Sequence, residues 1–209
     1  MSISITLHRS GTSRTQQVDT TTTGLDLFGS DRAVVAMRVD GNLVDLQREL
    51  HDGAEVEPVE ATSEDGLNII RHSATHVMAQ AVQQLYPEVN LGIGPFITDG
   101  FYYDFGNIEP VTPEVLSELE KRMKRIVKEN QRFVRRVTTE ESAREELADQ
   151  PYKLELIGTK GKGAEGASVE VGGGELTIYG NVRRNGEVAW KALCSGPHVP
   201  LSLIRVSAP

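Results

Sequence analysis

Residues 67–86 read LNIIRHSATHVMAQAVQQLY, and Pro87 follows them. Apolar side chains recur in this stretch at nearly every third or fourth position, which is the period of an amphipathic helix. Proline cannot continue a helix, so Pro87 ends the pattern. The sequence therefore predicts a long helix here, between a strand-rich N-terminal part and a mixed remainder.

The N-terminal part consists of short strand-like runs separated by turn residues. Alternating residues 3–7 begin a hairpin, residues 23–28 favour a turn or two of helix, and residues 33–39 form a strong strand. Two shorter strands are predicted at residues 43–46 and 54–59. Strands gathered around one helix indicate an α+β fold with the helix on one face of the sheet.

Residues 61–66 are small, acidic and turn-like, which is typical of a linker. We therefore predict a boundary near residue 62, with one domain over residues 1–62 and a second over residues 63–209.

The second part is predicted to mix helices with strands. A capping Thr112 and Pro113 begin a helix that extends to about Asn130, and residues 133–137 follow as a strand. A third helix is predicted over residues 139–149. The glycine-rich residues 158–186 indicate flexible hairpins, and strand-like residues 188–193 lead into the only cysteine.

Composition excludes several classes of protein. The chain has 209 residues, 38% of them hydrophobic and 25% charged, which is ordinary for a globular protein. No run approaches the roughly 20 apolar residues of a membrane span, and the start lacks a secretory signal pattern. A single cysteine cannot form an intramolecular disulfide, so a disulfide-stapled secreted scaffold is excluded. We expect a soluble, cytoplasmic protein.

Lysine is confined to one part of the chain. The net charge is −8, yet every lysine lies at position 121 or beyond. On the helix predicted there, four basic residues share one stripe because they are three or four positions apart. A solvated helix face is one interpretation, and contact with nucleic-acid phosphates is the other. The stripe consists of Lys121, Lys124, Arg125 and Lys128.

Two pairs of side chains are the strongest candidates for catalysis or metal binding. His72 and His76 are four positions apart on the predicted long helix, so both imidazoles share one face. Cys194 and His198 form a second pair far away in sequence. Together they are a complete tetrahedral ligand set for zinc, or a metal-free group able to activate water. A chance histidine pair and a cysteine buried for packing remain the alternative.

Several stretches resemble, in order along the chain, the N-terminal region of bacterial threonyl-tRNA synthetases. They are residues 72–76 (HSATH), 92–95 (GIGP), 99–104 (DGFYYD), 119–123 (LEKRM), 151–153 (PYK) and 194–200 (CSGPHVP).

The resemblance implies a ubiquitin-like β-grasp module, the TGS domain, over residues 1–62. It implies a threonyl/alanyl-type editing domain, C-terminally incomplete, over residues 63–209. In that family the editing domain hydrolyses seryl-tRNA(Thr), which forms when serine replaces threonine. A pocket discriminates one missing methyl group by only about 1–3 kcal/mol, so a second, hydrolytic site is needed.

Carried over residue by residue, the resemblance assigns catalytic and substrate-binding positions. The histidines would polarise water at the ester carbonyl, and the lysine would stabilise the oxyanion or the terminal ribose and phosphate. The glycines would form a tight pocket wall. The catalytic set is His72, His76, Lys153, Cys194 and His198. The substrate-binding set is Gly92, Gly94, Pro95, Tyr103 and Asp104.

Two positions depart from the family pattern, which usually reads Asp-x-Cys-Arg-Gly-Pro-His. Ala192 stands where the acid is expected and Ser195 where the arginine is expected. The first change removes an orienting or general-base carboxylate and the second removes an anchor. We therefore expect editing to be weakened, and a non-catalytic tRNA-binding module is a competing hypothesis.

Cofactor and partner expectations also follow from the resemblance. The four His and Cys residues resemble the zinc site of alanyl-type editing domains, whereas the threonyl branch edits without a required metal. Zinc therefore stays open, as does a zinc-stabilised structural domain. ATP and Mg²⁺ belong to a catalytic core that this sequence lacks, so aminoacylation is not expected of it. The expected partners are tRNA(Thr) and seryl-tRNA(Thr), with no membrane and no DNA, and full-length relatives are expected to be homodimers.

Overall fold

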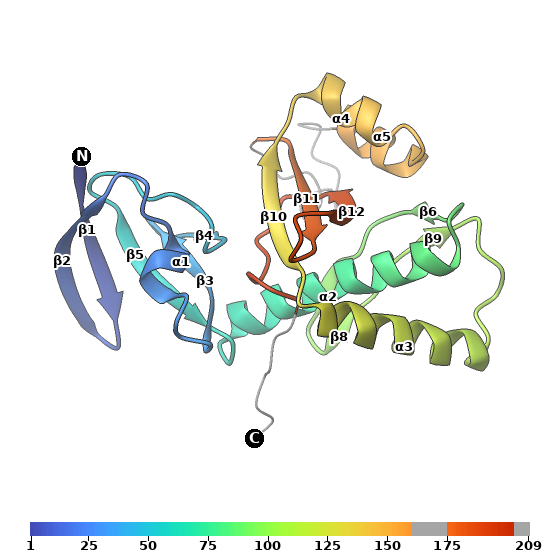
Figure 1. Cartoon of the computed structure of the whole chain (residues 1–209), viewed down its shortest axis with the longest axis horizontal. Helices are drawn as coiled ribbons and strands as arrows, with labels where there is room; N and C mark the ends of the chain where they lie inside the picture. Colours follow the sequence, from blue (N-terminus) through green and yellow to red (C-terminus); the bar gives the residue numbers. More distant parts are fainter. Residues whose placement is uncertain (160–174, 203–209) are drawn as a thin grey trace. The chain divides into compact units, whose positions relative to one another are not determined.

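The structure, a computed structural model, describes residues 1–159 and 175–202 (Figure 1). Its described residues fall into two compact units. The first comprises Met1–Ile70 with Pro197–Pro200, and the second comprises Arg71–Gly196, as far as it is described, with residues 201–202. The fold is a mixture of helices and sheets, as the α+β prediction requires. The β-grasp and editing-domain assignments, with a boundary near residue 62, stay predictions.

The first unit is built on a five-stranded sheet with the order β2-β1-β5-β3-β4. β1 and β5 are parallel, and the other neighbours are antiparallel. The predicted N-terminal hairpin and the strand near residues 33–39 are both confirmed. The strands are β1 (Ser2–Arg9), β2 (Thr12–Asp19), β3 (Val34–Val39), β4 (Asn42–Val44) and β5 (Glu55–Glu60).

An apolar core lies between this sheet and the short helix α1 (Gly24–Phe28). Gly24 lets the helix approach closely, because a Cβ there would lie 2.5 Å from the sulfur of Met37. The helix predicted at residues 23–28 is thus confirmed. The buried members of the core are Ile3, Ile5, Phe28, Val34, Met37, Leu46, Leu50, Ala54 and Val56.

The long helix α2 (Glu64–Leu85) confirms the pattern that predicted it. It begins three residues before the predicted start, because the Ser63 hydroxyl accepts the Gly66 N–H at 3.1 Å and caps the first turn. No helix in the described part of the chain is both long and apolar enough to cross a membrane.

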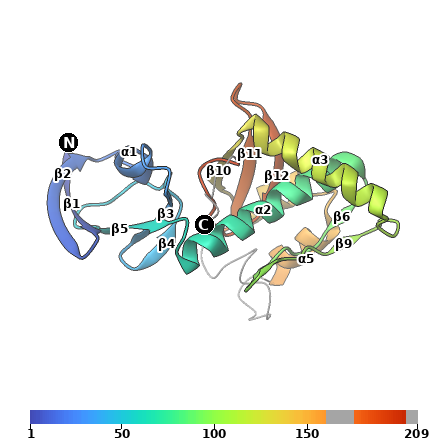
Figure 2. The same ribbon diagram turned by 90° about the horizontal axis from the view of Figure 1, so that it is seen from below.

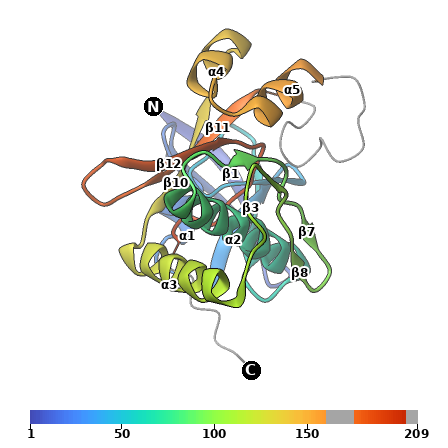
Figure 3. The same ribbon diagram turned by 90° about the vertical axis from the view of Figure 1, so that its right-hand side faces the viewer.

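In the second unit, a three-stranded antiparallel sheet lies between helices (Figure 3). Its strands, in spatial order, are β10 (Arg132–Val137), β11 (Thr177–Val182) and β12 (Val188–Leu193). Side chains of α2 hydrogen-bond to β11 and β12 on one face. On the other face, α4 (Glu140–Glu146) and α5 (Pro151–Thr159) pack on Ile178 and Leu193.

Helix α3 (Pro113–Glu129) lies alongside α2 (Figure 2). It begins as predicted, since the Thr112 hydroxyl accepts the Val115 N–H, and it ends at Asn130, which has the left-handed φ of 52°. Two short antiparallel ladders lie between α2 and α3 in sequence. They pair β6 (Asn90–Leu91) with β9 (Phe105–Gly106) and β7 (Phe96–Ile97) with β8 (Gly100–Phe101).

Two expectations for this unit need correction, and one helix was not predicted. The helix predicted over residues 139–149 ends at Glu146, and a further helix, α5, begins at Pro151. In residues 158–186, where flexible hairpins were predicted, β11 does form a hairpin with β12, but the predicted flexibility is wrong, because β11 is the central strand of the sheet and is buried on both faces despite Gly180. Residues 160–174 of that prediction lie outside the described part.

Candidate active site and metal centre

Helix α2 supplies two of the candidate residues. His72 and His76 are each 3% exposed, and their rings meet edge-on with centroids 5.6 Å apart. The helical spacing of four places both rings on the face of α2 that packs inside the unit. Thr75 lies between them and donates its hydroxyl to the His72 carbonyl at 2.7 Å.

The turn after β12 brings Cys194 to the histidines. Its sulfur lies 3.4 Å from His72 Nε2 and accepts the Gly196 N–H at 3.3 Å. Gly196 has a φ of +70°, and a Cβ on it would lie 2.0 Å from the hydroxyl of Tyr179. Only glycine satisfies both conditions, so this residue lets the turn close over the thiol.

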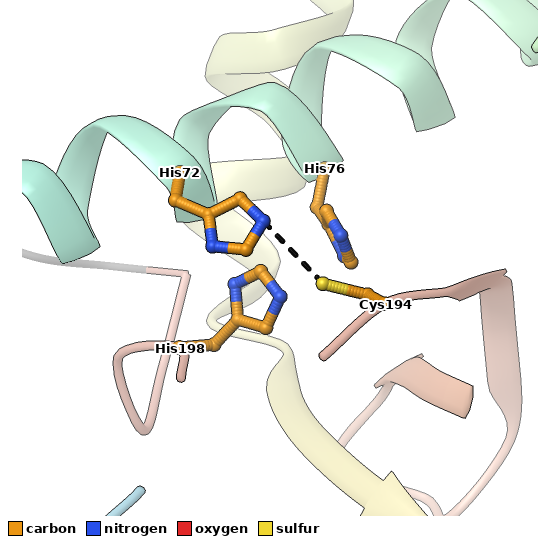
Figure 4. Close-up of side chains that lie close together, drawn as sticks. All are labelled: His72, His76, Cys194 and His198. Atoms are coloured by element: carbon orange, nitrogen blue, oxygen red, sulfur yellow. Dashed lines mark hydrogen bonds between the residues drawn. The ribbon is translucent and has the colours of Figure 1, made fainter. Parts of the chain in front are cut away.

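His198 completes the cluster (Figure 4). It is 1% exposed, and its backbone N–H donates to the Asp45 carboxylate at 2.7 Å. One potential ligand atom from each of His72, His76, Cys194 and His198 lies within 4.8 Å of the others, and all four residues are buried. The two pairs that the sequence separates by more than a hundred residues therefore converge.

Burial keeps His76 in its neutral form. The pKa of His76 lies well below the usual 6.5, first because the ring is desolvated and then because of the charges of His72 and Lys153. Three aromatic rings enclose it, with centroids at 5.1 Å for Trp190, 6.1 Å for Phe133 and 6.4 Å for Tyr179. A neutral imidazole can accept a proton or bind a metal.

The predicted lysine and aromatic residue also lie together. Lys153 on α5 is 1% exposed, and its Nζ lies 5.8 Å from the ring centroid of Tyr103. Tyr103 in turn stacks on Phe105 at 4.8 Å. A lysine buried this deeply is unusual and marks the position as a candidate for chemistry.

The glycine segment packs between Tyr103 and α2. A Cβ at Gly94 would lie 2.3 Å from the Tyr103 ring and 3.2 Å from the Thr75 Cβ. Gly92 is equally tight against Asp104, whose carbonyl accepts its N–H at 2.9 Å. Pro95 continues the segment, and its carbonyl accepts the Tyr102 N–H at 3.3 Å. The five predicted substrate-binding residues therefore lie in one pair of adjoining segments.

The basic stripe lies on the solvent face of α3, while Leu119 and Ile126 form the buried face. All four of its members are exposed, and none belongs to the histidine and cysteine cluster. Lys124 makes a helical ion pair with Glu120 at 2.6 Å.

Curated proteins that are similar to the chain include threonine–tRNA ligases of three bacteria. Over 200 residues, 96% of the chain, it is 98% identical to the threonine–tRNA ligase of Cutibacterium acnes, of which it covers 29%. The threonine–tRNA ligase of Streptomyces avermitilis is 58% identical over 95% of the chain, and that of Streptomyces griseus is 61% identical over 88%. No family model matches the chain.

The chain belongs to the threonine–tRNA ligase family. This confirms the resemblance read from the motifs. The chain spans less than a third of the length of these curated relatives and corresponds to their N-terminal region.

The donor set of this ligase region fits a zinc ion. Zinc binds imidazole nitrogen at about 2.0–2.1 Å and thiolate sulfur at about 2.3 Å, so tetrahedral ligand atoms lie roughly 3.3–3.8 Å apart. The four candidate atoms lie within 4.8 Å of one another, close to that requirement. Small side-chain movements would bring them to a common ion.

The residues that surround the cluster were not predicted. Tyr179 and Trp190 contact His76, and Gln80 follows His76 by one helical turn. Helical spacing could have identified Gln80, because residues 72, 76 and 80 share one face. Ala192, opposite Tyr179 in the sheet, places a methyl group where the family pattern has an acid.

Proposed function

We propose that this ligase region hydrolyses the ester bond of mischarged seryl-tRNA(Thr). The observation that carries the proposal is the convergence of four buried nitrogen and sulfur donors. The charge of the buried Lys153 acts on one of them, because it helps to lower the pKa of His76. Imidazole and thiol groups that lie this close together can activate a water molecule for hydrolysis of an ester. Membership in the ligase family supports a tRNA substrate.

In the proposed reaction, a water molecule attacks the seryl carbonyl carbon. His76 accepts a proton from that water, since burial keeps its imidazole neutral. The Lys153 ammonium group stabilises the negative charge that develops on the carbonyl oxygen. As the ester bond breaks, His76 passes this proton to the ribose oxygen. The His72 ring lies against the Cys194 sulfur during the reaction. Serine and an uncharged tRNA are released.

A metal bound here would take over the activation of water from His76, because an imidazole nitrogen that coordinates zinc cannot also accept a proton. If zinc binds to His72, His76, Cys194 and His198, it supplies Lewis-acid polarisation of the water or of the carbonyl. Elemental analysis of protein purified without chelator decides whether it is bound.

Selection of serine is proposed to depend on the segment from Gly92 to Pro95. Gly94 has no room for even one added carbon, because it packs against Tyr103 and against Thr75, which lies between His72 and His76 on α2. Such a wall would admit the serine hydroxymethyl group and exclude the extra methyl group of threonine.

The test measures release of labelled serine from preformed seryl-tRNA(Thr), with the 209-residue chain and with the full-length ligase. His72→Ala/His76→Ala should abolish release in both. The matched control, His8→Ala/His51→Ala, removes one half-buried and one exposed histidine outside the cluster and should leave the rate unchanged. Equal rates in wild type and in the His72/His76 variant would refute the proposal.

A second candidate is a tRNA-binding module without hydrolysis. Ala192 favours it, because no carboxylate lies at that position beside Tyr179. This candidate predicts salt-dependent tRNA binding with no serine release, and Ala192→Asp would then restore release. A zinc-stabilised structural domain is distinguished by melting on chelation.

A further inference from the structure

Two polar cross-links join α2 to the β11–β12 hairpin beside His76. Asn181 donates its side-chain N–H to Gln80 Oε1 at 2.8 Å, and the Trp190 indole donates to Gln83 Oε1 at 2.7 Å. Gln80 lies one helical turn beyond His76 on the same face. The cross-links therefore form the next layer of the interface after the imidazole.

The strand side of this layer continues from the same rings. Asn181 lies two positions beyond Tyr179 on β11, so both side chains point to the α2 face of the sheet. Tyr179 and Trp190 both contact His76 edge-on. Any shift of α2 against the hairpin would move His76 relative to these rings and to Cys194.

The amide pair leaves one donor and one acceptor in the interior. Gln80 is 0% exposed and Asn181 is 1% exposed. Within residues 1–159 and 175–202, Gln80 Nε2 and Asn181 Oδ1 have no hydrogen-bond partner. Burying such groups unpaired is unfavourable. Gln80 Nε2 is a donor and Asn181 Oδ1 is an acceptor, so one water molecule can accept a hydrogen bond from the first and donate one to the second.

We propose that Gln80 and Asn181 enclose a water molecule and act as positioning residues for His76. Hydrogen bonds are directional, so this polar layer fixes the register of α2 against β11 and β12 more narrowly than apolar packing would. The rate effect rests on the proposed ester hydrolysis, whereas the water site does not.

The main experiment compares Gln80→Leu, Asn181→Leu and the double variant in the full-length ligase. Each single change should lower Tm, because it leaves the other amide buried without its partner. The double change should recover most of the Tm, because both polar groups are removed together. The kcat for serine release should nevertheless stay about 10–100-fold below wild type in the double variant, with KM little changed. Recovery of kcat together with Tm would show a merely structural role and overturn the proposal.

Gln131→Leu is the matched control. Gln131 is 1% exposed, its Oε1 also has no partner among the described residues, and its Nε2 donates to Glu129 at 2.7 Å. It lies immediately before β10 and outside the cluster. The Tm of Gln131→Leu should fall, while its kcat per folded molecule should stay at the wild-type value. An equal loss of kcat in this control would overturn the assignment to Gln80 and Asn181.

Two measurements on the protein stand independently of hydrolysis. A high-resolution crystal structure should show a water within hydrogen-bond distance of Gln80 Nε2 and Asn181 Oδ1, and direct protein partners for both atoms would overturn the water site. The side-chain NMR signals of His76 should shift in the double variant and not in Gln131→Leu. If wild type releases no serine, the proposed function fails, and these two results still decide the positioning proposal.

Discussion

The two units bury very different interiors. Among its described residues, Met1–Ile70 buries one polar or charged side chain, Asp45, around an otherwise apolar core. The described part of Arg71–Gly196 buries ten, including His72, His76 and Lys153. Buried polar groups stabilise a fold less than apolar groups of equal size. The comparison indicates that Arg71–Gly196 places groups for chemistry at a cost in stability, whereas Met1–Ile70 does not.

The largest expected difference concerns two glycines that both have a positive φ. Gly11 in the first unit has a φ of +76° and open space around it, whereas Gly196 has a φ of +70° and faces the Tyr179 hydroxyl. Gly11→Ala should cost about 1–2 kcal/mol of unfolding free energy, from backbone strain alone. Gly196→Ala should cost about 2–5 kcal/mol, since overpacking adds to the strain. Urea unfolding of both variants measures this difference.

Serine release should also be lost in Gly196→Ala, because its N–H no longer reaches the Cys194 sulfur. Gly11→Ala is the control for backbone strain and should keep the wild-type rate. An equal loss of unfolding free energy in the two variants would mean that the Tyr179 side chain moves aside without strain and that the turn is not tightly packed.

The next difference is in acid stability. The folded pKa of His76 lies well below 6.5, so below about pH 6.5 the unfolded state binds a proton that the folded state does not. The unfolding free energy of the second unit should therefore fall with decreasing pH, by up to about 1.4 kcal/mol per pH unit for this one group.

The first unit should keep its stability to lower pH. Asp26 accepts the backbone N–H and the hydroxyl of Thr23, which lowers its pKa below 3.8. Its contribution is present above about pH 3.8 and is lost only as pH falls further. Fluorescence of Trp190, the only tryptophan, reports the second unit, and amide exchange at Ile5 and Val56 reports the first. Metal-free protein should show the second unit loosening first, and His76→Asn should reduce its pH slope.

A smaller effect of opposite sign is expected at Lys153. Lys153→Met removes a buried charge and keeps most of the side-chain volume, so the unfolding free energy should stay constant or rise by about 1 kcal/mol. Serine release should fall at least about a hundredfold, as for loss of an oxyanion-stabilising group. The reciprocal Met37→Lys, at a fully buried position of the first unit, should unfold that unit. A loss of more than about 2 kcal/mol in Lys153→Met would show that the lysine is mainly structural.

The contrast also explains which parts of the fold could be predicted from the sequence. Strands and helices with clear signals were found, such as β3 with its run of apolar residues and α3 with Thr112 and Pro113. Helix α5 was missed although Pro151 begins it in the same way as Pro113 begins α3, because its short apolar pattern is weak. β11 was expected only as part of flexible hairpins, because glycines on its N-terminal side suggested flexibility, whereas pairing with β10 and β12 makes it the central strand.

The candidate site was predicted to a similar extent. Spacing alone paired His72 with His76, and the family motifs joined them to Cys194 and His198. The surroundings were not predictable, because Trp190, Tyr179 and Asn181 reach His76 and Gln80 only through tertiary pairing across the sheet. Contacts between residues a hundred positions apart leave no periodic pattern in one sequence.

The smallest expected effect on stability concerns the basic stripe of α3. Lys121→Ala/Arg125→Ala should change the unfolding free energy by less than about 0.5 kcal/mol per residue, because both side chains are exposed. If the stripe contacts tRNA phosphates, the slope of log affinity against log salt should become shallower by about 1.4–1.8, since each of the two lost contacts removes roughly 0.7–0.9. Arg14→Ala/Arg32→Ala removes the same charge from exposed positions of the first unit and should leave the slope unchanged. Equal slopes in both variants would mean that positive charge anywhere on the chain contributes alike, and the confinement of lysine to residues 121 and beyond would then have no role in tRNA binding.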